Sequence, residues 1–163
     1  MSRERTYTWG DPNELAEAAL GLDGIDFLNK ISSGDLPAPP AGVTTGIVPV
    51  EVGDGRARFE LQPAEWHYNP IGSVHGGILS TLADTALGCA IHSKLRAGTG
   101  YASLDLTIKF TRAATLDSGL LTCEGRIVTI GRRAATAEAR ITDNADRVVA
   151  HAVTTCLLLP GPS

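Results

Sequence analysis

The sequence predicts an α+β domain in which one long, buried α-helix is covered by an antiparallel β-sheet. Two observations lead to this prediction. Residues 76–94 form an almost charge-free run that is apolar around nearly its whole circumference, as in a buried helix. The residues after this run alternate between apolar and polar side chains with period two, which is typical of strands with one buried face. The apolar face of such a sheet needs a partner, and the long helix supplies it.

The chain before the long helix predicts short helices and a hairpin. Residues 14–34 indicate one or two short helical pieces separated at glycines. Residues 35–42 (DLPAPPAG) predict an extended connection, because three prolines and a glycine oppose regular structure. Residues 43–62 predict a β-hairpin that turns at the glycine-rich positions 53–55. Pro49 indicates that the first strand of this hairpin is an edge strand or carries an irregularity.

The chain after the long helix predicts three or four long strands. Residues 101–113 form the first, and its apolar face comprises Leu104, Leu106, Ile108 and Phe110. Residues 118–159 form the others, divided by turn-forming residues at Gly131-Arg132 and at 143–146.

Size and composition limit the class of protein. A chain of 163 residues is large enough for one domain with a sizeable core, and we expect a leader at residues 1–23 and a single domain at 24–163. A net charge of −4 argues against a nucleic-acid partner. The polar N-terminus and the lack of a membrane-length apolar run predict a cytoplasmic protein. The spacing of the three cysteines does not suit zinc, so we expect small buried hydrophobes at Cys89, Cys123 and Cys156.

The start of the long helix carries the features that indicate chemistry. Gly76 and Gly77 open it, and their N–H groups belong to the first turn, where the helix supplies no acceptor. Together with the helix dipole, such donors can stabilise an oxyanion. Asp84 is the one acid of the helical run. Apolar surroundings disfavour the charge of a carboxylate unless another group stabilises it, so this position indicates a specific role. A lone acid and oxyanion donors suggest acyl transfer, most simply hydrolysis. The alternatives are a tight loop-to-helix junction and a structural, hydrogen-bonded Asp.

Asp84 and Gly76 are eight residues apart, which is about 12 Å along one helix. One carbonyl group cannot contact both residues of the same chain. If both act on one bond, they come from two subunits, and a two-fold dimer becomes part of the mechanism.

One spaced motif resembles a known family. It comprises Asn69, Gly72, His75, Gly76, Gly77, Leu82, Asp84 and Ala86. The pattern, with similar flanking segments over about residues 24–159, resembles the hotdog-fold thioesterases of the phenylacetate-pathway (PaaI) type. The resemblance implies a curved antiparallel sheet wrapped around one central helix, and dimers that usually pair into homotetramers. It also implies hydrolysis of an acyl-CoA thioester without a metal or redox cofactor.

The resemblance also implies roles for single residues. For Asp84 we predict, from the residues themselves, that it activates a water as general base or attacks the carbonyl itself to give an anhydride. Ser103 helps to hold the attacking water, and the alternative is a strand-end serine in solvent. Asn69 contacts the thioester or its water, although it precedes a proline and fits an ordinary turn. For His75 we favour a structural role at the helix start over that of a base.

Coenzyme A is polyanionic, so an acidic protein needs local positive charge to bind it. Arg132 and Arg133 are the first candidates, and Arg112 and Lys94 are weaker ones. Exposed turn residues without a ligand are an equal alternative for each. No motif includes the other three histidines, which we expect to be incidental: His67, His92 and His151.

The sequence leaves the acyl group open between aryl and medium-chain groups. Two other functions are compatible with the fold. One is a hotdog hydratase or dehydratase, for which no matching acid–histidine pair is evident. The other is a non-catalytic acyl-CoA-binding or regulatory domain.

Overall fold

The computed structural model describes residues 2–160 and contains four α-helices and seven strands in that range. The helices are α1 (Pro12–Gly21), α2 (Gly24–Ser33), α3 (Pro40–Thr45) and α4 (Gly76–His92). The strands are β1 (Ile47–Gly53), β2 (Arg56–Leu61), β3 (Thr99–Ser103), β4 (Thr107–Phe110), β5 (Leu121–Ile130), β6 (Ala134–Thr142) and β7 (Val148–Pro160). Two 3₁₀ turns, at Glu65–His67 and Leu116–Ser118, complete the described chain.

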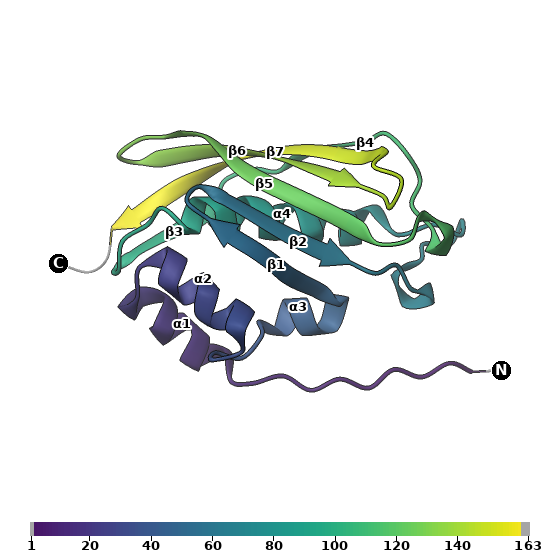
Figure 1. Ribbon diagram of the computed structural model, residues 1–163, viewed down its shortest axis with the longest axis horizontal. Helices are drawn as coiled ribbons and strands as arrows, with labels where there is room; N and C mark the ends of the chain where they lie inside the picture. The colour runs from purple at the N-terminus through teal and green to yellow at the C-terminus, as the bar shows by residue number, and fades with distance from the viewer. Residues whose placement is uncertain (1, 161–163) are drawn as a thin grey trace.

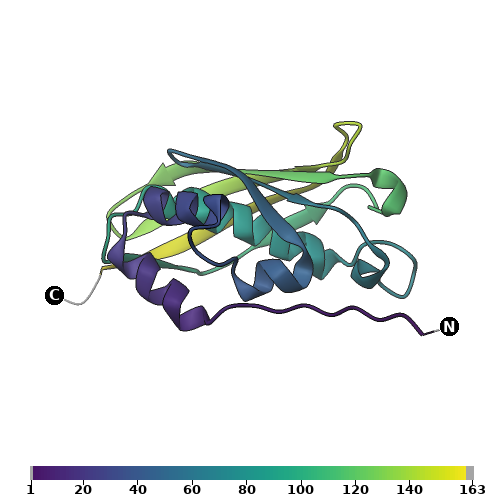
Figure 2. The same ribbon diagram turned by 60° about the horizontal axis from the view of Figure 1, so that its bottom comes forward.

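All seven strands form one antiparallel sheet in the order β1-β2-β5-β6-β7-β3, with β4 also paired to β7. The sheet curves around α4, and the three short helices lie on the other side of the β1–β2 hairpin (Figure 1). In the turned view, α4 passes between the short helices and the sheet (Figure 2). The predicted α+β hotdog architecture, with a curved sheet around one central helix, is therefore confirmed.

The core lies between α4 and the concave face of the sheet. Leu82, Leu87 and Ile91 of α4 are fully buried there. The facing strands contribute mainly small residues, so the helix approaches the sheet closely. At Gly125 the approach is so tight that a Cβ atom would overlap the backbone carbonyl of Ala86. No helix within residues 2–160 is long and apolar enough to cross a membrane.

The connection before β1 differs from its prediction. Residues 40–45 form the short helix α3 instead of extended chain and strand. Pro40 occupies the first turn, where its missing N–H costs nothing, and Gly46 ends the helix with a left-handed φ of 80°. The prediction for Pro49 is confirmed, because β1 is an edge strand and its register shifts between Pro49 and Glu51.

The predicted strand at residues 101–113 is also different, because it is interrupted. β3 and β4 pair with successive parts of β7, and Asp105 lies between them. The Asp105 carboxylate accepts a hydrogen bond from the Thr155 N–H at 2.8 Å, and the Asp105 backbone carbonyl accepts one from the Thr154 hydroxyl. At this point, hydrogen bonds that involve side chains replace the backbone hydrogen bonds between the strands. Leu104 and Phe110, expected on the buried face, are exposed by 62% and 50%.

The N-terminal segment packs against the rest of the chain. Leu15 of α1 forms a second apolar cluster with Phe27 and Leu28 of α2. Ahead of α1, the Arg5 guanidinium donates to the Thr44 carbonyl at 2.7 Å and lies over the Trp66 ring. The segment expected as a leader thus contacts α2, α3 and the loop before α4.

Candidate active site

Asp84 projects from α4 beside the end of β3, where the Ser103 hydroxyl donates to its carboxylate at 3.2 Å. The two side chains share an open surface hollow with Ser80, Thr81 and Asp105. The expectation that Asp84 is buried is wrong for the single chain, in which this residue is exposed. The helix is buried where it faces the sheet, whereas Asp84 is exposed next to Ser103 of the edge strand β3. A carboxylate held by a hydroxyl and open to a ligand is suited to bind and deprotonate water.

Gly76 lies at the start of α4, beside a separate hollow of about 370 Å³. Asn69, Phe110 and Arg112 also line this hollow. The ring of Phe110 covers Gly76 so closely that an added Cβ atom would lie 3.0 Å from it. Within residues 2–160, no group accepts a hydrogen bond from the Gly76 N–H. An unpaired donor at the positive end of a helix is suited to a carbonyl oxygen or oxyanion.

Gly77 does not offer the free donor that was expected. Its N–H donates to Nδ1 of the His75 ring at 2.8 Å, which makes His75 the N-cap of α4. The carbonyl of His75 accepts from the Ile78 N–H at 2.9 Å. The prediction of two unpaired glycine donors is therefore wrong for Gly77, because the preceding side chain satisfies it.

Asn69 organises the loop that precedes α4. Its side-chain oxygen accepts from the backbone N–H groups of Ile71 and Ser73, both at 3.1 Å, and its amide donates to the Ser73 hydroxyl. These are the bonds of an Asx-type turn. Asn69 thus has the turn geometry, and it also lines the hollow beside Gly76.

The predicted residues therefore form two groups within one chain. Gly76 lies at the start of α4 with Asn69 in the preceding loop, whereas Asp84 lies about 12 Å further along the helix, beside Ser103 of β3. A single thioester cannot reach both groups of the same chain.

The basic candidates differ in their surroundings. Arg132 and Arg133 are exposed in the turn between β5 and β6. Ala135, two residues after Arg133, pairs with Cys156 of β7, and Cys156 pairs on its other side with Ser103 of β3. Ala135 therefore lies two strands from Ser103, on the order of 10 Å away. Lys94 is paired with Asp54 at 2.7 Å.

Two of the remaining histidines have structural contacts. His67 is buried, and its ring is bonded to the Thr45 carbonyl at 2.7 Å and to the Ala64 N–H at 3.0 Å. His151 lies on the outer face of the sheet, 3.6 Å from Glu138. Cys123 and Cys156 are buried as predicted, and Cys89 is partly buried.

His92 was judged incidental, but it lies in an apolar cavity of about 420 Å³ that the sequence did not reveal. Thr85, Cys89 and His92 of α4 line the cavity together with Tyr101 of β3. The spacing of four and three residues places the three α4 side chains on one face, which was the available signal. The other walls come from α1–α3, β1 and Phe59 of β2, which no local pattern connects to α4.

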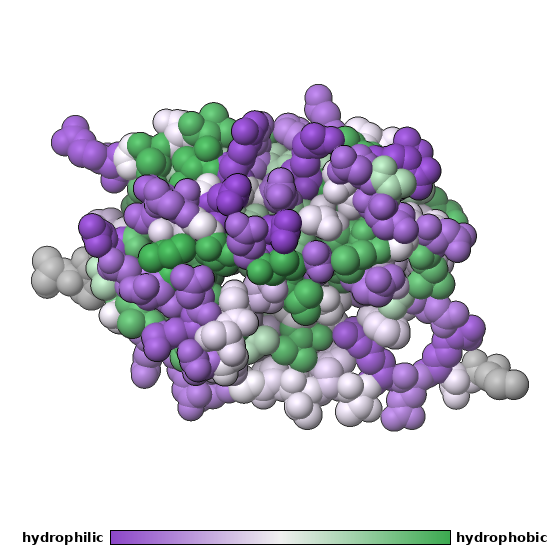
Figure 3. Space-filling model, viewed as in Figure 1, coloured by the Kyte–Doolittle hydropathy of each residue, from purple (hydrophilic) through white to green (hydrophobic). Residues whose placement is uncertain are grey.

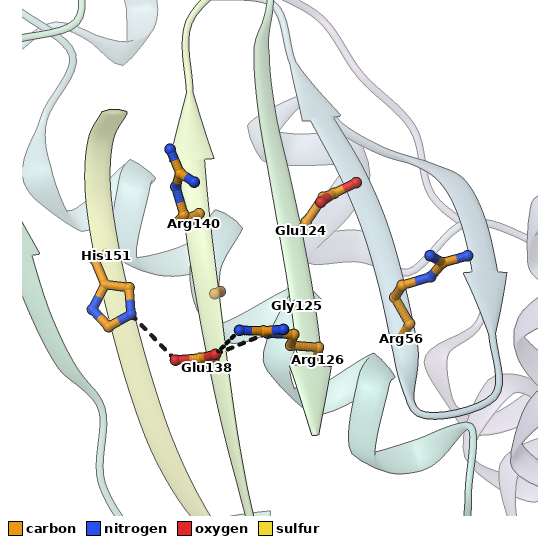
Figure 4. Close-up of a pocket in the computed structure, with 8 residues that line it drawn as sticks. Arg56, Glu124, Gly125, Arg126, Glu138, Arg140 and His151 are labelled. Atoms are coloured by element: carbon orange, nitrogen blue, oxygen red, sulfur yellow. Dashed lines mark hydrogen bonds and ion pairs between the residues drawn. The ribbon is translucent and has the colours of Figure 1, made fainter. Parts of the chain in front are cut away.

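A charged hollow lies on the opposite, convex face of the sheet (Figure 4). There the Arg126 guanidinium donates to Glu138 at 2.8 Å, and His151 lies on the other side of the same carboxylate. This hydrogen bond with Arg126 is the main reason that the pKa of Glu138 is lowered. Glu138 is therefore engaged from both sides, by Arg126 and by His151.

The fold is that of a hotdog protein. Its central helix α4 carries an exposed acid, Asp84, and an unpaired N–H donor at its first residue, Gly76. The chain matches the family model of the thioesterase superfamily over residues 71–150. A Halobacterium salinarum protein with a provisional esterase name is 32% identical over 106 residues, which cover 62% of this chain and 68% of that protein. The 1,4-dihydroxy-2-naphthoyl-CoA hydrolase of Listeria monocytogenes is 27% identical, over 65% of this chain and 85% of that enzyme.

Solved structures agree with these sequence matches. A phenylacetic acid degradation-related protein of Ralstonia eutropha superposes with a TM-score of 0.72 at 26% identity, over 79% of this chain and 97% of that one. A hypothetical thioesterase of Streptococcus pneumoniae, solved with coenzyme A, superposes with a TM-score of 0.64 at 26% identity. The match covers 72% of this chain and 88% of that one. The chain belongs to the thioesterase superfamily, and its class of activity is thioester hydrolysis.

Proposed function

We propose that the protein hydrolyses an acyl-CoA thioester, with an aryl or medium-chain acyl group, to the free acid and coenzyme A. The observation that carries this proposal is the Ser103–Asp84 pair, an open carboxylate on a helix whose other faces are largely buried. The names of the Listeria hydrolase and of the coenzyme A-bound Streptococcus structure support coenzyme A as the thiol.

In the proposed reaction, Asp84 and Ser103 hold a water molecule. The water oxygen adds to the thioester carbonyl carbon while Asp84 takes its proton. The C–S bond then breaks, the electron pair leaves with sulfur, and the proton on Asp84 neutralises the coenzyme A thiolate. Alternatively, Asp84 attacks the carbon and displaces the thiolate, and water hydrolyses the resulting anhydride.

The oxyanion in this scheme accepts a hydrogen bond from the Gly76 N–H of the second subunit. The unpaired state of that donor and its separation of about 12 Å from Asp84 of the same chain support this arrangement. Each active site is then shared by a homodimer, which pairs further into a homotetramer. Asn69 and His75 maintain the loop and the helix start around Gly76, while Gly77, Arg132 and Arg133 contribute to coenzyme A binding.

The first test is thiol release from a panel of aryl- and alkyl-CoA esters by Asp84→Asn protein. We expect kcat to fall by about 10²- to 10⁴-fold with unchanged folding, because the amide cannot accept the proton of water. Asp105→Asn is the matched control, since an amide oxygen can still accept from the Thr155 N–H. Full turnover by the Asp84 variant would refute the mechanism.

The shared site is tested by mixing two inactive variants. Gly76→Pro removes the N–H at a first-turn position where proline suits the helix, and Gly76→Ala controls for contact with the Phe110 ring. After unfolding and refolding together, Gly76→Pro and Asp84→Asn chains should recover about one quarter of the wild-type rate. Half of the dimers would be mixed, and each mixed dimer would contain one intact site of two. No recovery would mean that both residues act within one chain.

Rapid-quench kinetics separate the two roles of Asp84. A burst of free thiol, one per active site and ahead of free acid, would identify the anhydride route. Simultaneous release of thiol and acid would identify attack by water.

A further inference from the structure

We propose that Cys156 is a positioning residue of the candidate site: its thiol donates a hydrogen bond to the Ser103 hydroxyl and thereby keeps that hydroxyl directed at Asp84. The inference rests on the proposed function and adds a third residue to the Ser103–Asp84 pair. It gives the thiol a role beyond that of the small buried hydrophobe expected at this position.

Cys156 lies in β7, next to the edge strand β3. It pairs directly with Ser103 of β3 on one side and with Ala135 of β6 on the other. Directly paired residues point to the same face of a sheet, and Cys156 belongs to the apolar core between the sheet and α4. The Ser103 side chain therefore points toward α4 as well, where it contacts Asp84.

The two edges of the sheet differ in what borders the core. At the β1 edge the surface is apolar, because Val48 and Val50 are exposed and hydrophobic side chains gather over the β1–β2 hairpin (Figure 3). At the β3 edge the core instead borders the polar hollow that contains Asp84 and Ser103. Cys156 is thus a fully buried side chain with a polar neighbour, at the point where the core meets the candidate site.

The contacts of Ser103 determine which atom is the donor. The Ser103 oxygen lies 3.2 Å from an Asp84 carboxylate oxygen and 3.7 Å from the Cys156 sulfur. A hydroxyl has one proton, and a carboxylate is a much stronger acceptor than a thiol sulfur, so the Ser103 proton points to Asp84. In the second contact the Cys156 S–H is therefore the donor, and the Ser103 oxygen is the acceptor.

The surroundings of Cys156 keep its thiol protonated, as a donor must be. Burial raises the pKa of the thiol, and the charges of Asp84 and Asp105 add to this effect. The Ser103 and Thr154 hydroxyls oppose the increase, but the pKa stays above its ordinary value. A protonated thiol is a poor nucleophile, so a role in positioning suits this residue better than covalent chemistry.

The thiol completes the hydrogen bonding of the Ser103 hydroxyl. A hydroxyl oxygen has one proton and two lone pairs, and it can rotate between partners. With the proton directed at Asp84 and one lone pair facing Cys156, the second lone pair is left for a water molecule in the hollow. The thiol thus opposes rotation of the hydroxyl, so that Ser103 and Asp84 hold the attacking water in one orientation.

A double-mutant cycle on the release of coenzyme A tests the inference, with the ester that the wild type hydrolyses fastest. Cys156→Ala should lower kcat by about three- to tenfold, the size expected for one lost hydrogen bond, and leave KM within about twofold. Ser103→Ala removes the acceptor of this bond. In the Ser103→Ala background, Cys156→Ala should change kcat by less than about 1.5-fold, because the thiol acts through Ser103.

Cys123→Ala is the matched control. Cys123 is equally buried in the same core, on β5. Its truncation should lower the midpoint of thermal unfolding about as much as Cys156→Ala does, and kcat should stay within about twofold of the wild type. Equal losses of kcat in the two cysteine variants would overturn the inference. So would a loss from Cys156→Ala that is as large in the Ser103→Ala background as in the wild type. Full turnover by Asp84→Asn would refute the proposed function instead.

Infrared spectroscopy tests the same contact without relying on turnover. A thiol that donates a hydrogen bond has a lower S–H stretching frequency than a free thiol. Ser103→Ala should therefore raise the frequency of one of the three cysteine thiols, and that band should be absent from Cys156→Ala protein. Unchanged frequencies in Ser103→Ala protein would overturn the inference. Because this comparison needs only the wild type and Ser103→Ala, it decides the question even if Cys156→Ala does not fold.

Discussion

The two faces of the sheet differ in the side chains that they present: the concave face is apolar and packed against α4, and the convex face carries charged residues. On the concave face, alternate residues of β5 and β6 are small or apolar and pack closely against α4, as at Gly125. On the convex face, Glu138 of β6 forms ion pairs with Arg126 of β5 and His151 of β7. The most conspicuous charged hollow is therefore not where we place the chemistry. The unpaired donor and the open carboxylate lie on α4, next to Phe110 of β4 and Ser103 of β3.

This comparison teaches that the satisfaction of polar groups is a better guide to a site than their number. Glu138 on the convex face is engaged by both Arg126 and His151. The Gly76 N–H, by contrast, has no partner within the described chain. Substitutions on the two faces should therefore differ widely in their effect on the free energy of unfolding.

The largest effect is expected for Leu82→Ala on the concave side. Leu82 is fully buried in α4, and its truncation should lower the free energy of unfolding by about 2–5 kcal/mol through lost burial and a cavity. Urea denaturation at fixed protein concentration measures the change. Val128→Ala is the control on a residue 59% exposed, and a loss there as large as for Leu82 would contradict the comparison.

A smaller effect is expected for Gly125→Ala. The new methyl group would overlap the Ala86 backbone, which cannot move without shifting α4, so we expect a loss of about 1–3 kcal/mol. Gly131→Ala adds the same methyl group in the β5–β6 turn, where the nearest atom would be 3.5 Å away. The two midpoints of thermal unfolding should separate clearly, and equal midpoints would mean that helix and sheet are less tightly packed than observed.

The smallest effect is expected for Glu138→Gln on the convex face. The hydrogen bond with Arg126 lowers the pKa of Glu138, so its stabilisation is present above the ordinary glutamate pKa and is lost as pH falls through the lowered value. Because Arg126 is mostly exposed, we expect no more than about 0.5 kcal/mol at neutral pH. The difference between variant and wild type should vanish in acid, and a difference that grows there would reverse the assigned sign.

Much of the fold could be predicted from local patterns. The β1–β2 hairpin, α4 and the divisions between β5, β6 and β7 follow from periodicity and turn residues, which are properties of short segments. The break between β3 and β4 could not be predicted in this way. It depends on bonds from Asp105 to Thr154 and Thr155, about fifty residues away.

The candidate site likewise has a part that the sequence predicts and a part that depends on contacts between distant segments. The sequence by itself determined Gly76 and Asp84 as candidates and fixed their separation, because both lie on one helix of regular rise. Only the tertiary structure decided that Ser103 contacts Asp84 and that α1–α3 enclose a cavity at His92. Those contacts join segments whose patterns are independent of each other, and packing alone brings them together.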